Sequence, residues 1–177
     1  MQMRNEPAMV SGENHRMHAP DIQILPLRTS EDRIAFRTLN EEWITRHFVM
    51  EKKDREILND PDKEILAKGG HIFMAHAGEE IVGCVALIPM GRGVYELSKM
   101  AVSQKLRGLG IGRKLLLRAI EEAKALGAKS LFLGSSTKLK SAVHLYESAG
   151  FRHVPPIEIP PMPYTRADVF MEMRFDH

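Results

Sequence analysis

Hydrophobic positions along the chain change their spacing several times, and each change marks an expected element. Ile22, Ile24 and Leu27 suggest a first strand, and apolar residues then recur at helical spacing over 31–47. Ser30 is expected to cap that helix. Two shorter helical segments are expected at 54–57 and 61–68.

From residue 72 onward the spacing becomes that of strands. The segments 72–75, 81–89 and 94–102 predict two antiparallel hairpins. A long amphipathic helix is expected at 112–126 and a second one at 142–149, with a buried strand at 130–134 between them. Two last strands are expected at 151–154 and 167–174. The order β-α-α-β-β-β-α-β-α-β-β predicts an α/β fold, an α+β arrangement around one mixed sheet.

Composition supports one globular domain. The chain has 177 residues, of which 44% are hydrophobic and 27% charged. Residues 1–20 are polar and read as a tail, and 21–177 as the domain. No apolar run reaches the ~20 residues that cross a bilayer, so no membrane partner is expected. A net charge of +2 gives no support for a nucleic-acid partner.

The single cysteine, Cys84, cannot form an internal disulfide, which favours a cytoplasmic location. It lies within an apolar run, so we expect a small buried side chain rather than a nucleophile.

The most informative segment is 106–114, Leu-Arg-Gly-Leu-Gly-Ile-Gly-Arg-Lys, between a strand and a long helix. Its glycines leave backbone amides uncovered at a helix N-terminus, where a phosphate binds well. A P-loop is excluded because no hydroxyl residue follows Lys114. A dinucleotide-binding loop fits poorly, since the glycines fall as G-x-G-x-G and the next strand ends in Gly134 without an acidic residue. The remaining pattern is R-x-x-G-x-G, formed by Arg107, Gly110 and Gly112.

This pattern, preceded by Met-Ala-Val at 100–102, resembles the acyl-coenzyme A motif of the GNAT N-acetyltransferase superfamily. A second segment, 142–151, resembles the A-x-x-L-Y-x-x-x-G-F signature of the same family. The resemblance implies the GNAT fold and an acyltransferase that moves an acetyl group from acetyl-CoA to a primary amine by direct attack, without an acyl-enzyme. A GNAT fold that binds acyl-CoA as a sensor, without turnover, is the alternative.

The resemblance also implies which residues hold acetyl-CoA. A bulged strand would grip the pantetheine arm through its backbone, and amides of the glycine loop would hold the pyrophosphate. Family members often carry an asparagine where this chain has Leu139, so Ser135, Ser136 or Thr137 is expected to replace its hydrogen bond. The expected cofactor-binding residues are Met100, Ala101, Val102, Arg107, Gly108, Leu109, Gly110, Ile111, Gly112, Arg113 and Ser136.

Two residues are expected to carry the chemistry. Tyr146 matches the family's usual general acid, which would protonate the departing thiolate. Glu96, eleven residues before Arg107, would take a proton from the substrate ammonium. The competing interpretations are a tyrosine that packs its ring in the core with its hydroxyl at the rim, and a strand glutamate that faces solvent or forms a salt bridge.

The acceptor is expected to bind between the first helices and the connection that precedes the last strand. Trp43, Arg46 and Tyr164 are the predicted substrate contacts, which suit an anionic or amphipathic amine on a small molecule or a protein. No metal is expected, because His71 and His76 should point to opposite faces of a strand. A homodimer remains possible.

Overall fold

The computed structural model describes residues 21–159, 161 and 165–176. The expected tail, 1–20, lies outside these residues. Helices and strands follow the predicted order, and the short segment expected at 61–68 is divided into α3 and the 3-10 helix η1. In chain order the elements are β1 (Ile22–Pro26), α1 (Ser30–His47), α2 (Lys52–Asn59), α3 (Pro61–Glu64), η1 (Leu66–Lys68), β2 (His71–Ala77), β3 (Glu80–Gly91), β4 (Val94–Val102), η2 (Gln104–Leu106), α4 (Ile111–Ala125), β5 (Ser130–Ser135), α5 (Lys140–Ala149), β6 (Arg152–His153), η3 (Pro156–Glu158) and β7 (Val169–Arg174).

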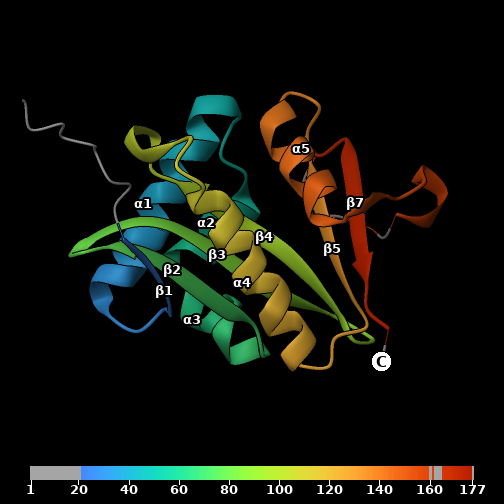
Figure 1. Cartoon of the computed structure of the whole chain (residues 1–177), viewed down its shortest axis with the longest axis horizontal. Coiled ribbons are helices and arrows are strands. Elements are labelled where there is room, and N and C mark those ends of the chain that lie inside the picture. The colour runs from blue at the N-terminus through green and yellow to red at the C-terminus, as the bar shows by residue number, and fades with distance from the viewer. Residues whose placement is uncertain (1–20, 160, 162–164, 177) are drawn as a thin grey trace, which may run out of the picture.

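All described strands form one sheet, in the order β1-β2-β3-β4-β5-β7-β6. Neighbours run antiparallel except β4 and β5, which are parallel and joined through α4. The mixed sheet predicted from the sequence is thereby confirmed. Figure 1 shows β1–β4 on one side of the molecule and β5 with β7 on the other.

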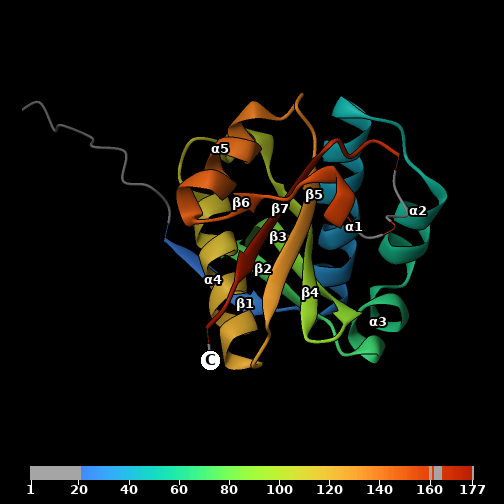
Figure 2. The same cartoon turned by 90° about the vertical axis from the view of Figure 1, so that its right-hand side faces the viewer.

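Helices cover both faces of the sheet, and each face has its own hydrophobic core. Figure 2 shows α1, α2 and α3 on one side of the strands and α4 with α5 on the other. Phe36, Ile44 and Leu58 are fully buried on the α1–α2 side. Leu115, Leu116 and residues of β3 and β5 fill the α4 side. At ~25 cal/mol per Å² of buried apolar area, these two layers are the main source of stability.

The N-terminus of α1 differs from the sequence prediction. Thr29, rather than Ser30, caps the helix, because its hydroxyl accepts a hydrogen bond from the amide of Asp32 at 3.0 Å. The carboxylate of Asp32 in turn accepts from the amide of Thr29, which completes a capping box. The prediction was wrong because it placed the cap one residue too late. Three residues after Ser30 lies Arg33, whereas three residues after Thr29 lies Asp32, whose carboxylate can complete the capping box.

Candidate functional site

A cleft opens where β4 and β5 separate. The two parallel strands pair only from Val94 to Glu96 on β4 and from Ser130 to Phe132 on β5. Beyond Glu96, β4 continues to Val102 without a partner on that side, and Figure 1 shows the two strands diverging.

A β-bulge in β4 lies at the centre of this cleft. Between the pairs Ala86–Ser98 and Cys84–Ala101, β4 contains one residue more than β3. Lys99 sits in this bulge with φ of 53°, a left-handed conformation that is costly for a residue with a side chain.

The bulge changes the face to which side chains point. Leu97 packs in the α4-side core, whereas Ala101, four residues later, packs on the α1–α2 side. In a regular strand both would lie on one face. The extra residue therefore turns Lys99 away from α4 and toward α2.

The cleft encloses a cavity of about 730 Å³. Segments far apart in the sequence contribute to one continuous wall. One side of the cavity is lined by Asn40, Trp43, Ile44 and His47 of α1, by Phe48 just after it, and by residues 96–102 of β4. The glycine loop and the start of α4 contribute Leu106, Arg107, Gly108 and residues 110–113. The opposite side is lined by residues 134–136 at the end of β5, Lys138, Leu139, residues 140–142, Leu145 and Tyr146 of α5, and Arg166 with Ala167.

At one part of the wall, the glycine loop leads into α4. Gly108 and Gly110 have φ of +78° and +79°, and Gly110 is the N-cap of the helix. Neither a capping side chain nor an acidic residue lies in the first turn. The first amides of α4 therefore lack intrahelical partners and carry the positive end of the helix dipole. Together with Arg107 and Arg113, they suit a phosphate or pyrophosphate.

Glu96 lines the cavity just before the bulge. Burial raises the pKa of its carboxyl group, while the charge of Lys99 and a hydrogen bond with Ser98 lower it, and the net shift is upward. A carboxyl group with a raised pKa is a better proton acceptor when ionised than an ordinary glutamate. The geometry disfavours the interpretation of Glu96 as a solvated strand residue.

Tyr146 also lines the cavity, from α5. Its ring lies edge-on to Phe151 at 5.9 Å, and only 8% of the residue is exposed. Burial raises the pKa of its phenol to about 12, so the hydroxyl keeps its proton at neutral pH. The ring therefore packs in the core while the residue borders the cavity.

The other predicted site residues divide into two groups. Ser136 is buried and lines the cavity. Trp43 and Leu139 are half-buried and also line it. The exposed side chain of Leu109 lies outside the lining. Arg46 also lies outside it but lines a smaller neighbouring pocket with His47, Phe48 and Arg166, and it forms an ion pair with Glu42 at 2.8 Å. Tyr164 lies outside the described residues.

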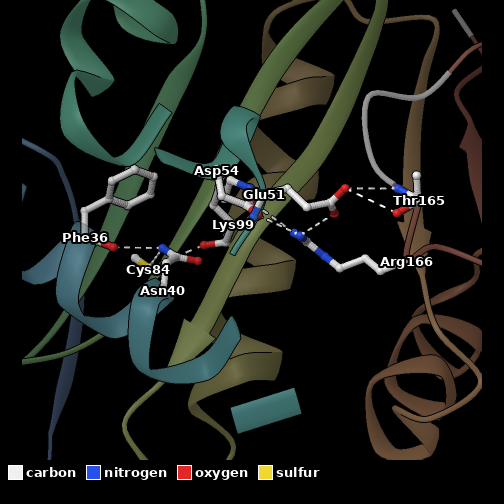
Figure 3. Close-up of polar contacts among 8 residues, drawn as sticks. All are labelled: Phe36, Asn40, Glu51, Asp54, Cys84, Lys99, Thr165 and Arg166. Atoms are coloured by element: carbon white, nitrogen blue, oxygen red, sulfur yellow. Dashed lines mark hydrogen bonds and ion pairs between the residues drawn. The ribbon is translucent and has the colours of Figure 1, made fainter. Parts of the chain in front are cut away.

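Sequence reasoning missed a charged group on the wall of the cleft. Lys99 and Arg166 line the cavity, and both donate hydrogen bonds to the fully buried carboxylate of Asp54 (Figure 3). A signal was present for Asp54, which falls in phase with the buried Ile57 and Leu58 of α2. A charged residue on a core-facing stripe needs a partner.

The lone cysteine is not positioned for chemistry. Cys84 is fully buried, and burial raises the pKa of its thiol to about 12. The Asn40 amide donates to its sulfur at 3.3 Å. The expectation of a structural cysteine is confirmed.

Two kinds of feature are absent from the described part of the chain. No helix there is long and apolar enough to span a membrane. No cluster of three or more potential metal-binding side chains occurs in the same residues. His71 and His76 approach different carboxylates, on α4 and α1 respectively, as expected for opposite faces.

A bulged strand separates from its parallel neighbour beside a glycine loop at a helix N-terminus, an arrangement that suits a phosphate-bearing ligand in the cleft. The model of the acetyltransferase (GNAT) family matches residues 34–151. The chain belongs to this family, and the resemblance inferred from its two motifs is confirmed.

Known relatives agree with this assignment. The chain is 34% identical to the uncharacterized N-acetyltransferase YvbK of Bacillus subtilis over 102 residues, which cover 56% of this chain and 66% of that protein. It is also 34% identical to the uncharacterized N-acetyltransferase YjgM of Escherichia coli, covering 51% of this chain and 57% of that protein. The matched segment thus spans less than two thirds of either relative.

Solved structures share the fold. A GNAT acetyltransferase from Staphylococcus aureus Mu50 superposes with a TM-score of 0.78 at 24% identity, covering 87% of this chain and 99% of that one. A Bacillus subtilis acetyltransferase in complex with CoA superposes with a TM-score of 0.64 at 21% identity, covering 88% and 99%.

Proposed function

We propose that this protein transfers an acetyl group from acetyl-CoA to a primary amine. The observation that carries the proposal is the single cavity lined both by the glycine loop and by Glu96 and Tyr146. Acyl donor and proton-transfer groups would therefore share one site. Family membership supports the same reaction class.

The residues present suit acyl-CoA. Uncovered amides from Gly108 to Arg113, with the Arg107 guanidinium, would hold the pyrophosphate. The backbone of residues 100–102, unpaired on the cleft side, would bind the amide groups of the pantetheine arm. Ser136 lines the same wall and can replace the hydrogen bond that Leu139 cannot make. CoA is present in the Bacillus subtilis neighbour, which supports the assignment. When bound, acetyl-CoA supplies the activated acyl group.

Two proton transfers are then needed. An amine attacks only when neutral, and Glu96 would accept its proton, directly or through water. Tyr146 would donate a proton to the departing thiolate sulfur. The C–N bond forms as the C–S bond breaks, so no acyl-enzyme is required. The burial of Cys84 supports direct attack.

The acceptor is proposed to lie against α1, where Trp43 and Phe48 line the cavity. Arg46 lines the smaller pocket beside this wall, and Arg166 lines both pockets. Aromatic walls with an arginine beside them suit an amphipathic or anionic amine, on a small molecule or on a protein. A cytoplasmic location is also part of the proposal, because a single cysteine cannot form an internal disulfide. A homodimer is proposed as well.

Titration with acetyl-CoA by calorimetry, followed by a thiol-release assay, tests the proposal. The assay panel should include amino acids, polyamines, aminoglycosides and peptides with a free N-terminus or lysine. Binding with turnover on any amine supports the enzyme. Binding without turnover across the panel supports the alternative, an acyl-CoA sensor. Absence of binding would overturn both.

A further inference from the structure

A buried ion cluster joins two distant parts of the chain beside the cleft. Asp54, which is fully buried, accepts hydrogen bonds from Lys99 at 2.7 Å and from both terminal nitrogens of Arg166 at 2.7 and 2.9 Å. The Glu51 amide donates to the same carboxylate at 2.9 Å. The Glu51 carboxylate also accepts from Arg166, at 2.9 Å (Figure 3).

The cluster anchors one end of a short segment, residues 165–168, which we call the strap. At this end, the backbone and hydroxyl of Thr165 donate to Glu51 at 3.4 and 3.3 Å. These contacts join residues more than 110 positions apart.

The other end of the strap is fixed to the far side of the cleft. The Asp168 amide donates to the carbonyl of Ser135, at the end of β5, at 3.0 Å. Its carboxylate accepts from the backbone and hydroxyl of Thr137 at 2.8 and 2.9 Å. The strap therefore runs from β5 to the start of α2, across the opening left where β4 and β5 diverge.

Residues in the strap face the cavity and contact its aromatic wall. Arg166 and Ala167 both line the cavity. The Arg166 guanidinium lies 5.8 Å from the centroid of the Phe48 ring, whose centroid is 6.2 Å from that of Trp43. A chain of contacts thus leads from the ion cluster to Trp43.

Stability alone is a weak reason for such a cluster. Buried ion pairs are often replaceable by apolar residues without loss of stability, because desolvation offsets their attraction. Lys99 also adopts a left-handed conformation to reach Asp54. What the cluster does supply is a fixed geometry for Arg166.

We propose that the strap closes the end of the cleft lined by Trp43 and Phe48, and that Arg166 is the positioning residue that holds it shut. For the acetyl transfer proposed above, on which this consequence rests, the strap would set the size and shape of the acceptor that can enter. Acetyl-CoA would bind at the glycine loop independently of it.

Acrylamide quenching of fluorescence tests the strap directly, because Trp43 is the only tryptophan in the sequence. Arg166→Ala is expected to raise the Stern–Volmer constant about twofold or more, since the aromatic wall loses its cover. The Kd for coenzyme A should stay within about twofold, because Arg166 is held by Glu51 and Asp54 rather than by the glycine loop that would bind coenzyme A. Failure to bind coenzyme A in the parent protein would count against the proposed function but would leave the quenching test valid.

A matched control is Arg33→Ala. Arg33 also joins two segments through a bidentate pair, with Asp62 at 2.7 Å for both bonds, but it lies outside the cavity lining. Its loss should leave the quenching of Trp43 unchanged. If Arg166→Ala fails to fold, Glu51→Gln weakens the same anchor with a smaller perturbation and should raise quenching in the same direction. Unchanged quenching in a folded anchor variant, or quenching raised equally by Arg33→Ala, would overturn the proposal.

Discussion

Tyr146 and Glu96 border the same cavity, and the proposed acetyl transfer gives them opposite roles as acid and base. Burial raises the pKa of the Tyr146 phenol to about 12, which keeps it a proton donor. Burial also raises the pKa of Glu96, although Lys99 and Ser98 oppose this. A donor and an acceptor whose protonation is set by burial are what acetyl transfer to an ammonium group requires.

Replacement of Tyr146 by Phe removes the donor but keeps the ring that packs on Phe151. We expect kcat to fall about 100-fold, a typical contribution of a positioned acid. The Kd for acetyl-CoA should hardly change. Stopped-flow or steady-state thiol release, compared with calorimetric binding, measures both. Equal losses in kcat and affinity would contradict a role as acid.

Replacement of Glu96 by Gln tests the base through the pH profile. A base works only when ionised, so the parent rate should be high above the raised pKa of Glu96 and fall as the pH drops through it. The variant should lose this acidic limb and about 100-fold in kcat. Glu80→Gln, at an exposed position on β3, is the control and should keep the parent profile. An unchanged acidic limb in Glu96→Gln would exclude Glu96 as the base.

At the scale of elements, the start of α4 depends on glycines for a conformational reason. Gly110 has φ of +79°, and a Cβ there would meet nothing within 4 Å. Gly110→Ala should therefore cost about 1 kcal/mol through backbone strain alone. It should also weaken acetyl-CoA binding, because the helix N-terminus moves. Gly112 lies inside α4 without a positive φ, so Gly112→Ala should leave stability unchanged or slightly raised. Urea unfolding measures both, and equal destabilisation would contradict the explanation.

Elements were largely predictable because their signals are local. The positions of glycines and the spacing of hydrophobic residues predicted β4 at its observed residues and α4 within one residue of its observed ends. The glycine loop was recognised for the same reason, since its chemistry lies within one short segment.

The missed residues depend on information that a local pattern lacks. Strict alternation places Leu97, Lys99 and Ala101 on one face, and only the bulge separates them. Arg46, which was predicted for the acceptor, lines a smaller pocket beside the cavity and pairs with Glu42 one helical turn away. The bond between Arg166 and Asp54 spans 112 positions, and no periodicity in the sequence reports such a contact.

At the scale of the whole molecule, the cleft separates two groups of elements that meet along only a few β4–β5 pairs. The sheet continues beneath the cleft, while the ion cluster of Asp54 and the strap joins the two groups above it. The two groups are therefore held together by the sheet and its apolar packing on one side of the cleft, and by the ion cluster and the strap on the other. The stability of the domain should accordingly depend on pH more than its modest net charge suggests.

Acid unfolding tests this dependence. Burial tends to raise the pKa of Asp54, but hydrogen bonds from Arg166 and Lys99 lower it from 3.8 to about 2. A carboxyl group with a depressed pKa stabilises the fold fully above its unfolded value and loses that effect as the pH falls toward its folded one. The unfolding free energy should therefore drop by about 2 kcal/mol between these two values, on account of this group.

Urea unfolding of the parent and of Asp54→Asn, repeated across the acidic range, separates this contribution from those of other carboxylates. The variant should be less stable at neutral pH by about 3 kcal/mol, because Lys99 loses its buried counter-ion, and its stability should fall less steeply with acid. Asp62→Asn is the matched control, since the Asp62–Arg33 pair is solvent-exposed and about 0.5 kcal/mol is typical for such a pair. A parent and an Asp54→Asn variant with the same acid slope would show that the cluster does not hold the two parts of the molecule together.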